Sequence, residues 1–226
     1  MESNHYVKKA TWIAVAVILM VLVIDQASKF WVKLNMQYGE EFFIFGMSWA
    51  RIHFVENEGM AFGLSLGNST GKLLLSLFRI VAAGFLVFII RSLIKTRESI
   101  GLIVCFSLIL AGAVGNIIDS AVYGLIFSST PYHGGLATLF PPEGGYAPFL
   151  FGKVVDMFYF PMIDTILPEW IPIWGGERFQ FFQPVFNVAD SAITIGIFAI
   201  LLFYRRFFRE QKKNKSEEDI VANELR

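Results

Sequence analysis

The sequence predicts an all-α membrane protein with four transmembrane helices, formed by residues 1–226 as a single domain. Hydrophobic residues make up 55% of the chain and charged residues only 17%, whereas about a quarter of the residues in soluble domains are charged. The mean hydropathy of +0.55 agrees with this composition. A helix that crosses a bilayer needs ~20 mostly apolar residues. Four stretches qualify: 11–32, 72–94, 100–119 and 186–204.

The first stretch, 11–32, has two interpretations. Its basic start and apolar core are also features of a secretory signal peptide. However, no small-x-small cleavage site follows the core, and Trp31 is typical of an anchor at the membrane–water interface. We therefore interpret this stretch as a retained helix.

Basic residues of the termini and the short link all fall on one side of the four predicted spans. The N-terminus carries two lysines, the link 91–98 carries three basic residues and the tail 205–226 carries seven. Because basic connections tend to stay in the cytoplasm, we expect both termini to be cytoplasmic. The longer segments, 33–71 and 120–185, would then lie on the outer side.

The two outer segments have compositions that predict ordered structure rather than further spans. Residues 39–66 alternate apolar and polar side chains in places, which predicts short strands. Residues 120–185 contain all eight prolines of the chain. Because proline breaks helices, we expect no fifth span there. A loop of this length usually has a function, such as a lid or a binding surface.

Composition disfavours several kinds of partner and site. The formal net charge is zero, so no overall positive field favours nucleic acid. Cys105 is the single cysteine, which excludes an internal disulfide framework, and its apolar surroundings suit a buried hydrophobe. The three histidines are scattered without the spacing of metal ligands. We therefore expect no metal and no cofactor.

Four aspartates converge on the outer side in this topology. Asp25 lies in the outer part of the first span and Asp119 at the end of the third. Asp190 begins the fourth span, and Asp156 lies in the outer segment before it. Ionisable residues at such positions are costly and usually face a bundle interior or a cavity.

Structural roles are open for three of these acids. Asp25 can pair with Lys29, one helical turn later. Asp119 can brace helix packing, and Asp190 can cap a helix start, where an acid complements the helix dipole. Asp156 has no helix end nearby and lies among apolar residues, so a functional role is more prominent for it.

Amides near the same face extend this polar set and suggest a chemistry. Asn57, Asn116 and Asn187 can hold carboxylates by hydrogen bonds. Two carboxylates in one site share a single proton because one pKa rises. The ionised acid can then take a proton from water while the protonated acid polarises an amide carbonyl.

Two classes of protein are compatible with such acids. One is an aspartyl hydrolase at the outer membrane face, and the other is a proton- or cation-coupled carrier, which also uses intramembrane acids. The small size, the four spans and the lack of an internal repeat weigh against the carrier.

Five blocks in order resemble lipoprotein signal peptidase, the signal peptidase II family. They are "DQASK" (25–29), "NEGMAFG" (57–63), "GNIID" followed by Ser120, "VVDM" (154–157) and "FNVADSAITIG" (186–196). Each block alone is a weak signal, but five in order on four spans are specific. The resemblance implies a multi-pass aspartic protease of the bacterial inner membrane, with its active site at the periplasmic face.

The resemblance also implies roles for individual residues. Asp156 and Asp190 match the catalytic pair of the family. The supporting polar set, with Lys29 beside Asp25, comprises Asn57, Asn116, Asp119, Asn187, Asp25 and Lys29. The implied fold adds a small periplasmic β-cradle at residues 39–66 and a loop or helix flap over the site.

The implied substrates are prolipoproteins that carry diacylglycerol on a cysteine. The family cuts the signal peptide from them just before that lipidated cysteine. We expect a monomer whose other partners are membrane lipids. A module that binds lipoproteins without cutting them is a further alternative.

The chain departs from the family pattern at three places. Ser120 stands where the family often has arginine, and Met157 where it usually has phenylalanine. Arg79 in the second span is a candidate replacement for that arginine, or else its side chain snorkels to the interface. The stretch between the two catalytic acids is also long, which suggests an enlarged periplasmic flap.

Overall fold

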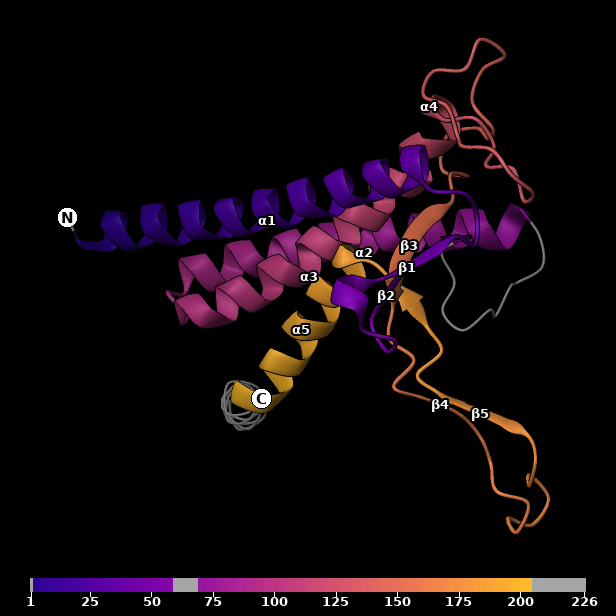
Figure 1. Cartoon of the computed structure of the whole chain (residues 1–226). Coiled ribbons are helices and arrows are strands. Elements are labelled where there is room, and N and C mark those ends of the chain that lie inside the picture. Colours follow the sequence, from indigo (N-terminus) through magenta and orange to yellow (C-terminus); the bar gives the residue numbers. More distant parts are fainter. Residues whose placement is uncertain (1, 59–68, 205–226) are drawn as a thin grey trace, which may run out of the picture.

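A bundle of helices carries a small antiparallel sheet at one of its ends (Figure 1). The computed structural model describes residues 2–58 and 69–204 of the chain. The last part of the predicted cradle, most of the "NEGMAFG" block and the predicted tail lie outside these described residues.

The bundle consists of four long helices: α1 (Glu2–Asn35), α2 (Ser69–Lys95), α3 (Ile100–Ile118) and α5 (Val188–Phe203). Among the described residues, the helices that contain the first three predicted spans are long and apolar enough to cross a membrane. Helix α5 has 16 residues, which corresponds to ~24 Å at 1.5 Å per residue and is shorter than a typical span. The count of four spans therefore stays a prediction.

Helix α3 is the centre of the bundle and packs against α1, α2 and α5. Small residues make this packing close, as their cluster near residue 112 predicts. A Cβ atom added to Gly112 would lie 2.2 Å from the carbonyl oxygen of Ala189 in α5. One added to Gly196 of α5 would lie 2.7 Å from the carbonyl oxygen of Cys105. Backbone therefore contacts backbone where α3 crosses α5.

The sheet has four antiparallel strands in the order β1-β2-β3-β6. Strands β1 (Glu41–Phe43) and β2 (Arg51–Asn57) confirm the short strands expected in residues 39–66. Strands β3 (Val154–Tyr159) and β6 (Val185–Phe186) come from the proline-rich segment and enlarge the sheet beyond the predicted cradle. The description all-α therefore understates the strand content. Short apolar runs do not reveal by themselves whether they form helix or strand.

Helix α3 ends in an irregular turn beside the sheet. The chain continues through the π-helical segment η3 (Asp119–Tyr123) into the short helix α4 (Gly124–Ile126). Such π-helical turns occur mostly inside α-helices at functional sites. This turn contacts β3 and brings the end of the third predicted span next to the strand that carries Asp156.

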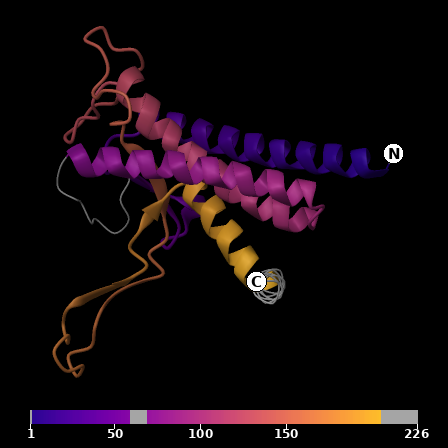
Figure 2. The same ribbon diagram turned by 180° about the vertical axis from the view of Figure 1, so that it is seen from behind.

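The predicted flap is instead a β hairpin that points away from the bundle. Strands β4 (Ile163–Ile166) and β5 (Arg178–Phe181) pair with each other and not with the four-stranded sheet. Figures 1 and 2 both show this hairpin as a projection beyond the helices and the sheet. In this structure it does not fold back over the bundle as a loop or helix.

Three apolar clusters lie along the molecule and leave room for one polar layer. Two fill the bundle, one around Ile103 and one around Ala111. The third, around Phe54, lies under the sheet and includes Val32 and Tyr123. On α1 and α3, the polar residues of the predicted site fall between the bundle clusters and the sheet cluster. The fold thus buries a polar layer between the apolar interior of the bundle and the apolar cluster under the sheet.

Substitution of Gly112 by alanine tests the close packing of α3 on α5. Because the added methyl group would overlap backbone and the Ile193 side chain, we expect a loss of ~1–3 kcal/mol, typical of overpacking. Gly84 of α2 is the matched control, since a Cβ atom added there would meet nothing within 4 Å. Thermal unfolding in detergent should show a lower Tm for Gly112→Ala alone. Equal Tm values for both variants would contradict the packing argument.

Candidate active site

The polar side chains predicted for the site gather in one connected region where the helices meet the sheet. Helix α1 supplies two of them, β2 one, α3 with η3 two, β3 one, and the start of α5 two. The set comprises Asp25, Lys29, Asn57, Asn116, Asp119, Asp156, Asn187 and Asp190. Hydrogen bonds or ion pairs link every one of them to another member of the set.

Lys29 lies between two carboxylates at the centre of this region. Its Nζ atom is 2.9 Å from Asp25 Oδ2 and 2.8 Å from Asp119 Oδ2, and all three side chains are fully buried. The same Nζ donates to Asn116 Oδ1 at 3.0 Å. Removing ions from water costs several kcal/mol each, so these three charges depend on one another. The predicted Asp25–Lys29 pair is therefore present as part of a triad.

Backbone and amide N–H groups donate further hydrogen bonds to the two carboxylates of the triad. Asp25 Oδ1 accepts the N–H of Ala189 at 2.8 Å, in the first turn of α5, where the helix dipole is positive. Asp119 accepts from Gln26 Nε2 at 2.9 Å and from the N–H of Val155 at 3.4 Å. The bracing role expected for Asp119 is thus observed, and it joins α3 to β3.

Asn187 connects the two acids of the predicted catalytic pair. As the N-cap of α5, its Oδ1 accepts the N–H of Asp190 at 2.9 Å, while Asp190 Oδ2 accepts the N–H of Asn187 at 3.3 Å. This is the reciprocal capping box of a helix start. Its Nδ2 donates to Asp156 Oδ1 at 2.7 Å. One buried amide therefore sets the position of both acids.

Asp190 caps its helix and still directs one oxygen into the polar layer. Its Oδ1 accepts from Asn116 Nδ2 at 2.8 Å. The Asn116 amide is oriented by Lys29, which takes its oxygen as acceptor and leaves its NH₂ group for Asp190. The capping interpretation of Asp190 is confirmed, and it is compatible with a further role because only one of the two oxygens is used in the cap.

The pleat of β3 directs the Asp156 side chain toward the polar layer. Its neighbours Val155 and Met157 belong to the cluster under the sheet, so strand alternation turns Asp156 to the opposite face. Its side chain is only 2% exposed and also accepts from Asn57 Nδ2 at 3.2 Å. Burial and, to a lesser extent, the charge of Asp190 raise the pKa of Asp156 to about 7.

This arrangement can perform acid–base chemistry on a substrate carbonyl. A carboxyl group with a pKa of about 7 keeps a proton under conditions in which an ordinary aspartate has lost it. A second carboxylate, joined to it through Asn187, can act as the base. Such a pair activates water for attack on an amide.

Comparison with known proteins gives this chemistry a context. The family model for signal peptidase (SPase) II matches residues 17–207. The chain belongs to the signal peptidase II family. It is 51% identical over 195 residues to the lipoprotein signal peptidase of Porphyromonas gingivalis, covering 86% of this chain and 83% of that protein. It is also 34% identical to the lipoprotein signal peptidase of Amoebophilus asiaticus, covering 96% and 88%.

Two solved structures share the fold of this chain. Two bacterial membrane enzymes determined by the in meso method, at 2.3 and 1.9 Å resolution, superpose with TM-scores of 0.53 and 0.55. Their sequence identities are 21% and 23%, with 89% and 85% of this chain covered and 90% and 92% of theirs. At these identities the comparison supports the fold of the chain and no functional role.

The structure shows the surroundings of Ser120, which departs from the signal peptidase II pattern. Ser120 is buried, and its hydroxyl donates to the carbonyl of Asn116 at 3.1 Å. Arg79 lies on α2, whereas Ser120 lies in η3 after the end of α3. The replacement of the family's arginine by Arg79 stays a prediction.

A second buried ion pair, beside the candidate site, was not predicted. Lys33 pairs with Glu56 and donates to Thr130 Oγ1 at 3.0 Å, and this hydroxyl donates to Glu56 Oε1 at 2.8 Å. Because Glu56 precedes Asn57 on β2, the pair fixes that strand against α1. The only signal in the sequence was the spacing of Lys33, four residues after Lys29 and thus on the same helix face.

Gln26 was also missed, although it lies inside the "DQASK" block. Its Nε2 donates to both Asp25 Oδ2, at 3.0 Å, and Asp119 Oδ1, at 2.9 Å. Its Oε1 accepts from Tyr123 Oη at 3.1 Å. Gln26 therefore bridges Asp25 and Asp119, as Lys29 does, but without a charge. The signal for this role in the sequence was its position next to Asp25.

Replacement of Lys29 by methionine tests the triad. The change keeps much of the side-chain volume but leaves Asp25 and Asp119 buried without their cation, so we expect a loss of ~3–5 kcal/mol. Lys9→Met, at an exposed position on the same helix, should stay within ~0.5 kcal/mol of the parent. Thermal unfolding of both variants in detergent is the measurement. A Lys29→Met protein as stable as the parent would refute a stabilising triad.

Proposed function

We propose that this chain is an aspartic endopeptidase that removes the signal peptide from diacylglyceryl-modified prolipoproteins, cleaving before the lipidated cysteine. The observation that carries the proposal is the link between Asp156 and Asp190 through the buried amide of Asn187. Membership of the signal peptidase II family and relatives named lipoprotein signal peptidase support the choice of substrate.

In the proposed mechanism the two acids divide the work. Asp156 retains its proton, in accord with a pKa raised to about 7 by burial and by Asp190, and donates it to the scissile carbonyl. Asp190 takes a proton from the attacking water. As the C–N bond of the tetrahedral intermediate breaks, Asp190 passes this proton to the leaving amine and Asp156 takes its proton back from a hydroxyl of the intermediate, which becomes the carboxylic acid product. Asn57, Asn116 and Asn187 hold the carboxylates in position through the hydrogen bonds described above.

The apolar surroundings suit the proposed substrate. A signal peptide is an apolar helix, and its lipidated cysteine carries two acyl chains, so both reach the enzyme from the bilayer. Exposed leucines and phenylalanines cover the lipid-facing sides of α2 and α5, among them Leu74, Phe78, Phe85, Phe88 and Phe198. The acids lie at the end of these apolar helices, next to the sheet, where a peptide bond just outside the hydrocarbon would be cut.

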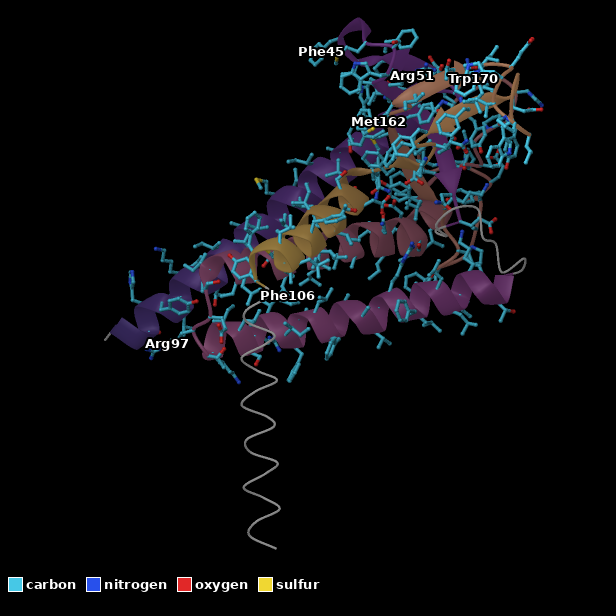
Figure 3. All side chains as sticks on the ribbon, turned by 90° about the horizontal axis from the view of Figure 1, so that it is seen from below. Phe45, Arg51, Arg97, Phe106, Met162 and Trp170 are labelled. Carbon is cyan, nitrogen blue, oxygen red and sulfur yellow. The ribbon has the colours of Figure 1, made fainter. Side chains whose placement is uncertain are left out.

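We further propose a bacterial inner-membrane location with both termini in the cytoplasm and the site at the periplasmic face. The basic residues of the link between α2 and α3, Arg91, Lys95 and Arg97, support this orientation. They lie at the end of the bundle opposite the sheet, as Figure 3 shows for Arg97.

Cysteine labelling in cells tests this orientation. In a Cys105→Ala background, Glu143→Cys should react with an impermeant maleimide added to spheroplasts. Thr96→Cys, in the link between α2 and α3, should be spared until the cells are lysed. Both positions are exposed in the folded protein, so access depends on the side of the membrane. External labelling at position 96 would overturn the orientation.

Asparagine substitutions test the catalytic pair. We expect Asp156→Asn and Asp190→Asn each to reduce cleavage of a lipidated precursor by at least ~10³-fold, because an amide can neither hold nor release the shared proton. The double variant should be no worse than either single one, since members of a catalytic unit are non-additive. Asp164→Asn is the matched control, an aspartate in an ion pair with Arg178 on the projecting hairpin. It should cleave at the parent rate.

The outcomes separate the competing classes. Substantial cleavage by Asp156→Asn or Asp190→Asn in the purified, folded variant would refute the assignment. A module that only binds lipoproteins would show no cleavage in the parent and unchanged precursor binding in both variants. A proton-coupled carrier would move solute or protons in liposomes without proteolysis.

The pH dependence follows from the raised pKa of Asp156. Its proton is lost as pH rises through about 7, so cleavage should decline on that basic limb. Between about pH 4 and 7 the folded protein keeps this proton while the unfolded chain has released it. The contribution of Asp156 to stability therefore falls as pH rises through this window. Asp156→Asn should remove this part of the pH dependence of Tm, and an unchanged dependence would contradict the burial of the acid.

A further inference from the structure

The projecting hairpin β4–β5 has one apolar and one polar face. In its register Ile163 lies opposite Phe181, and Thr165 lies opposite Phe179. Since strand side chains alternate between faces, these four share one side. Its three large hydrophobic side chains are 41–52% exposed. Among the described residues, no other element of the fold covers this side.

The other face of the hairpin is polar. Asp164 lies opposite Gln180, and Ile166 lies opposite Arg178. Asp164 accepts from Arg178 Nε at 2.7 Å and Nη2 at 2.6 Å, and from Gln180 Nε2 at 3.2 Å. This ion pair lowers the pKa of Asp164 to about 2. Ile166 is the single exception to the polar character of this side.

The tip that joins the two strands is also apolar and exposed. Trp170 is 80% exposed, Ile173 90% and Trp174 62%. An isolated two-stranded hairpin is marginally stable in water, and large exposed apolar surfaces mark interaction sites. The hairpin therefore requires an apolar partner on the side of Phe179 and at its tip.

The exposed aromatic residues of α1 indicate where the membrane surface lies. Trp12 and Trp31 are 72% and 51% exposed, and 19 residues of helix separate them, or ~28 Å. This distance agrees with the ~30 Å hydrocarbon thickness of a bilayer, and tryptophan is enriched at both interfaces. Trp31 therefore marks the interface at the sheet end of the bundle.

Exposed aromatic residues lie between this interface and the hairpin. Trp31 contacts Phe42 of β1, with ring centroids 6.2 Å apart, and the next exposed aromatic residues are Phe43, Phe45 and Trp49. Trp49 contacts Phe160, at the base of the hairpin, at 6.3 Å. Figure 3 shows Phe45, Met162 and Trp170 on the side of the molecule away from Arg97.

We propose that the hairpin is an interfacial membrane anchor: its apolar face and tip bind the lipid surface next to the bundle, and its polar face remains in water. The exposed aromatic residues between Trp31 and the base of the hairpin select the lipid bilayer as the partner. The hairpin carries three acids and one arginine over residues 163–181, so attraction to anionic headgroups does not drive its binding. Apolar burial and interfacial tryptophans do.

This anchor would act on the site through the sheet. Strand β4 follows β3, which carries Asp156, and β5 precedes β6, which leads into Asn187. Both strands of the hairpin therefore continue from the two segments that hold the acids. Attachment of the hairpin to the lipid surface would hold these segments at a constant depth relative to the bilayer. The inference does not depend on the catalytic assignment.

Labels on the two faces of β5 test the proposal. In a Cys105→Ala background, Phe179→Cys and Gln180→Cys are adjacent exposed or half-exposed positions that point to opposite faces, and Trp170→Cys reports on the tip. Each variant is labelled with an environment-sensitive fluorophore and inserted as a single copy into phosphatidylethanolamine–phosphatidylglycerol nanodiscs. Quenching by aqueous iodide and by a lipid with a nitroxide near the headgroup is then measured. Circular dichroism and a Tm equal to those of the Cys105→Ala parent confirm folding.

The proposal expects opposite patterns for the adjacent labels. Labels at 179 and 170 should be quenched several-fold more strongly by the nitroxide lipid than the label at 180, and iodide should show the reverse. High salt should leave these patterns unchanged. Equal quenching of 179 and 180 by iodide would overturn the proposal, because both faces of the hairpin would then lie in water. Protection of 179 from both quenchers would also overturn it, because the hairpin would then fold against protein.

Discussion

The buried contact of Lys29 with Asp25 and Asp119 is the constraint on which the rest of the site depends. These three groups come from α1 and from the end of α3, and each carboxylate also accepts a backbone N–H from another element. Asp25 takes that of Ala189 in α5, and Asp119 takes that of Val155 in β3. Because ions buried without partners are strongly destabilising, the helices and the strand can pack only where all these bonds form together. The charges thus determine the relative position of four elements.

The same lysine also orients the amides that hold the two acids. Lys29 bonds the oxygen of Asn116, so the NH₂ group of this amide must point the other way, where Asp190 accepts from it. Asn187 likewise uses its oxygen for the helix cap and its NH₂ group for Asp156. Amides can bind in either orientation in isolation, but here a cation at one end and a helix start at the other leave one choice. Both amides therefore present N–H donors to the two acids, which fixes the positions of the carboxyl groups.

Much of this site could be predicted from the sequence, because topology alone brings helix ends together. Once the spans and their direction were assigned, Asp25, Asp119 and Asp190 had to lie at one end. The strands β3 and β6 were missed because short apolar runs next to prolines carry no clear period. Lys33 and Glu56 are 23 residues apart, and only the folding of β2 onto α1 brings them into contact. The alternation of apolar and polar residues in "IDTI" and "RFQF" indicates the two faces of the hairpin. The direction in which the hairpin points could not be predicted from the sequence.

The two acids differ because different kinds of element hold them. Asp156 is paired with Val55 of β2, and its strand β3 also packs against α1 and η3, so the side chain is buried. A helix start has free N–H groups and an open end, so Asp190 keeps its hydrogen bonds while remaining half-exposed. Burial favours the neutral form of the first acid, and the helix start favours negative charge beside it. A strand and a helix joined by one residue, Asn187, therefore supply unequal environments for two identical side chains. The proposed sharing of one proton between the two aspartates needs that inequality, and in this fold it follows from secondary structure rather than from any special residue.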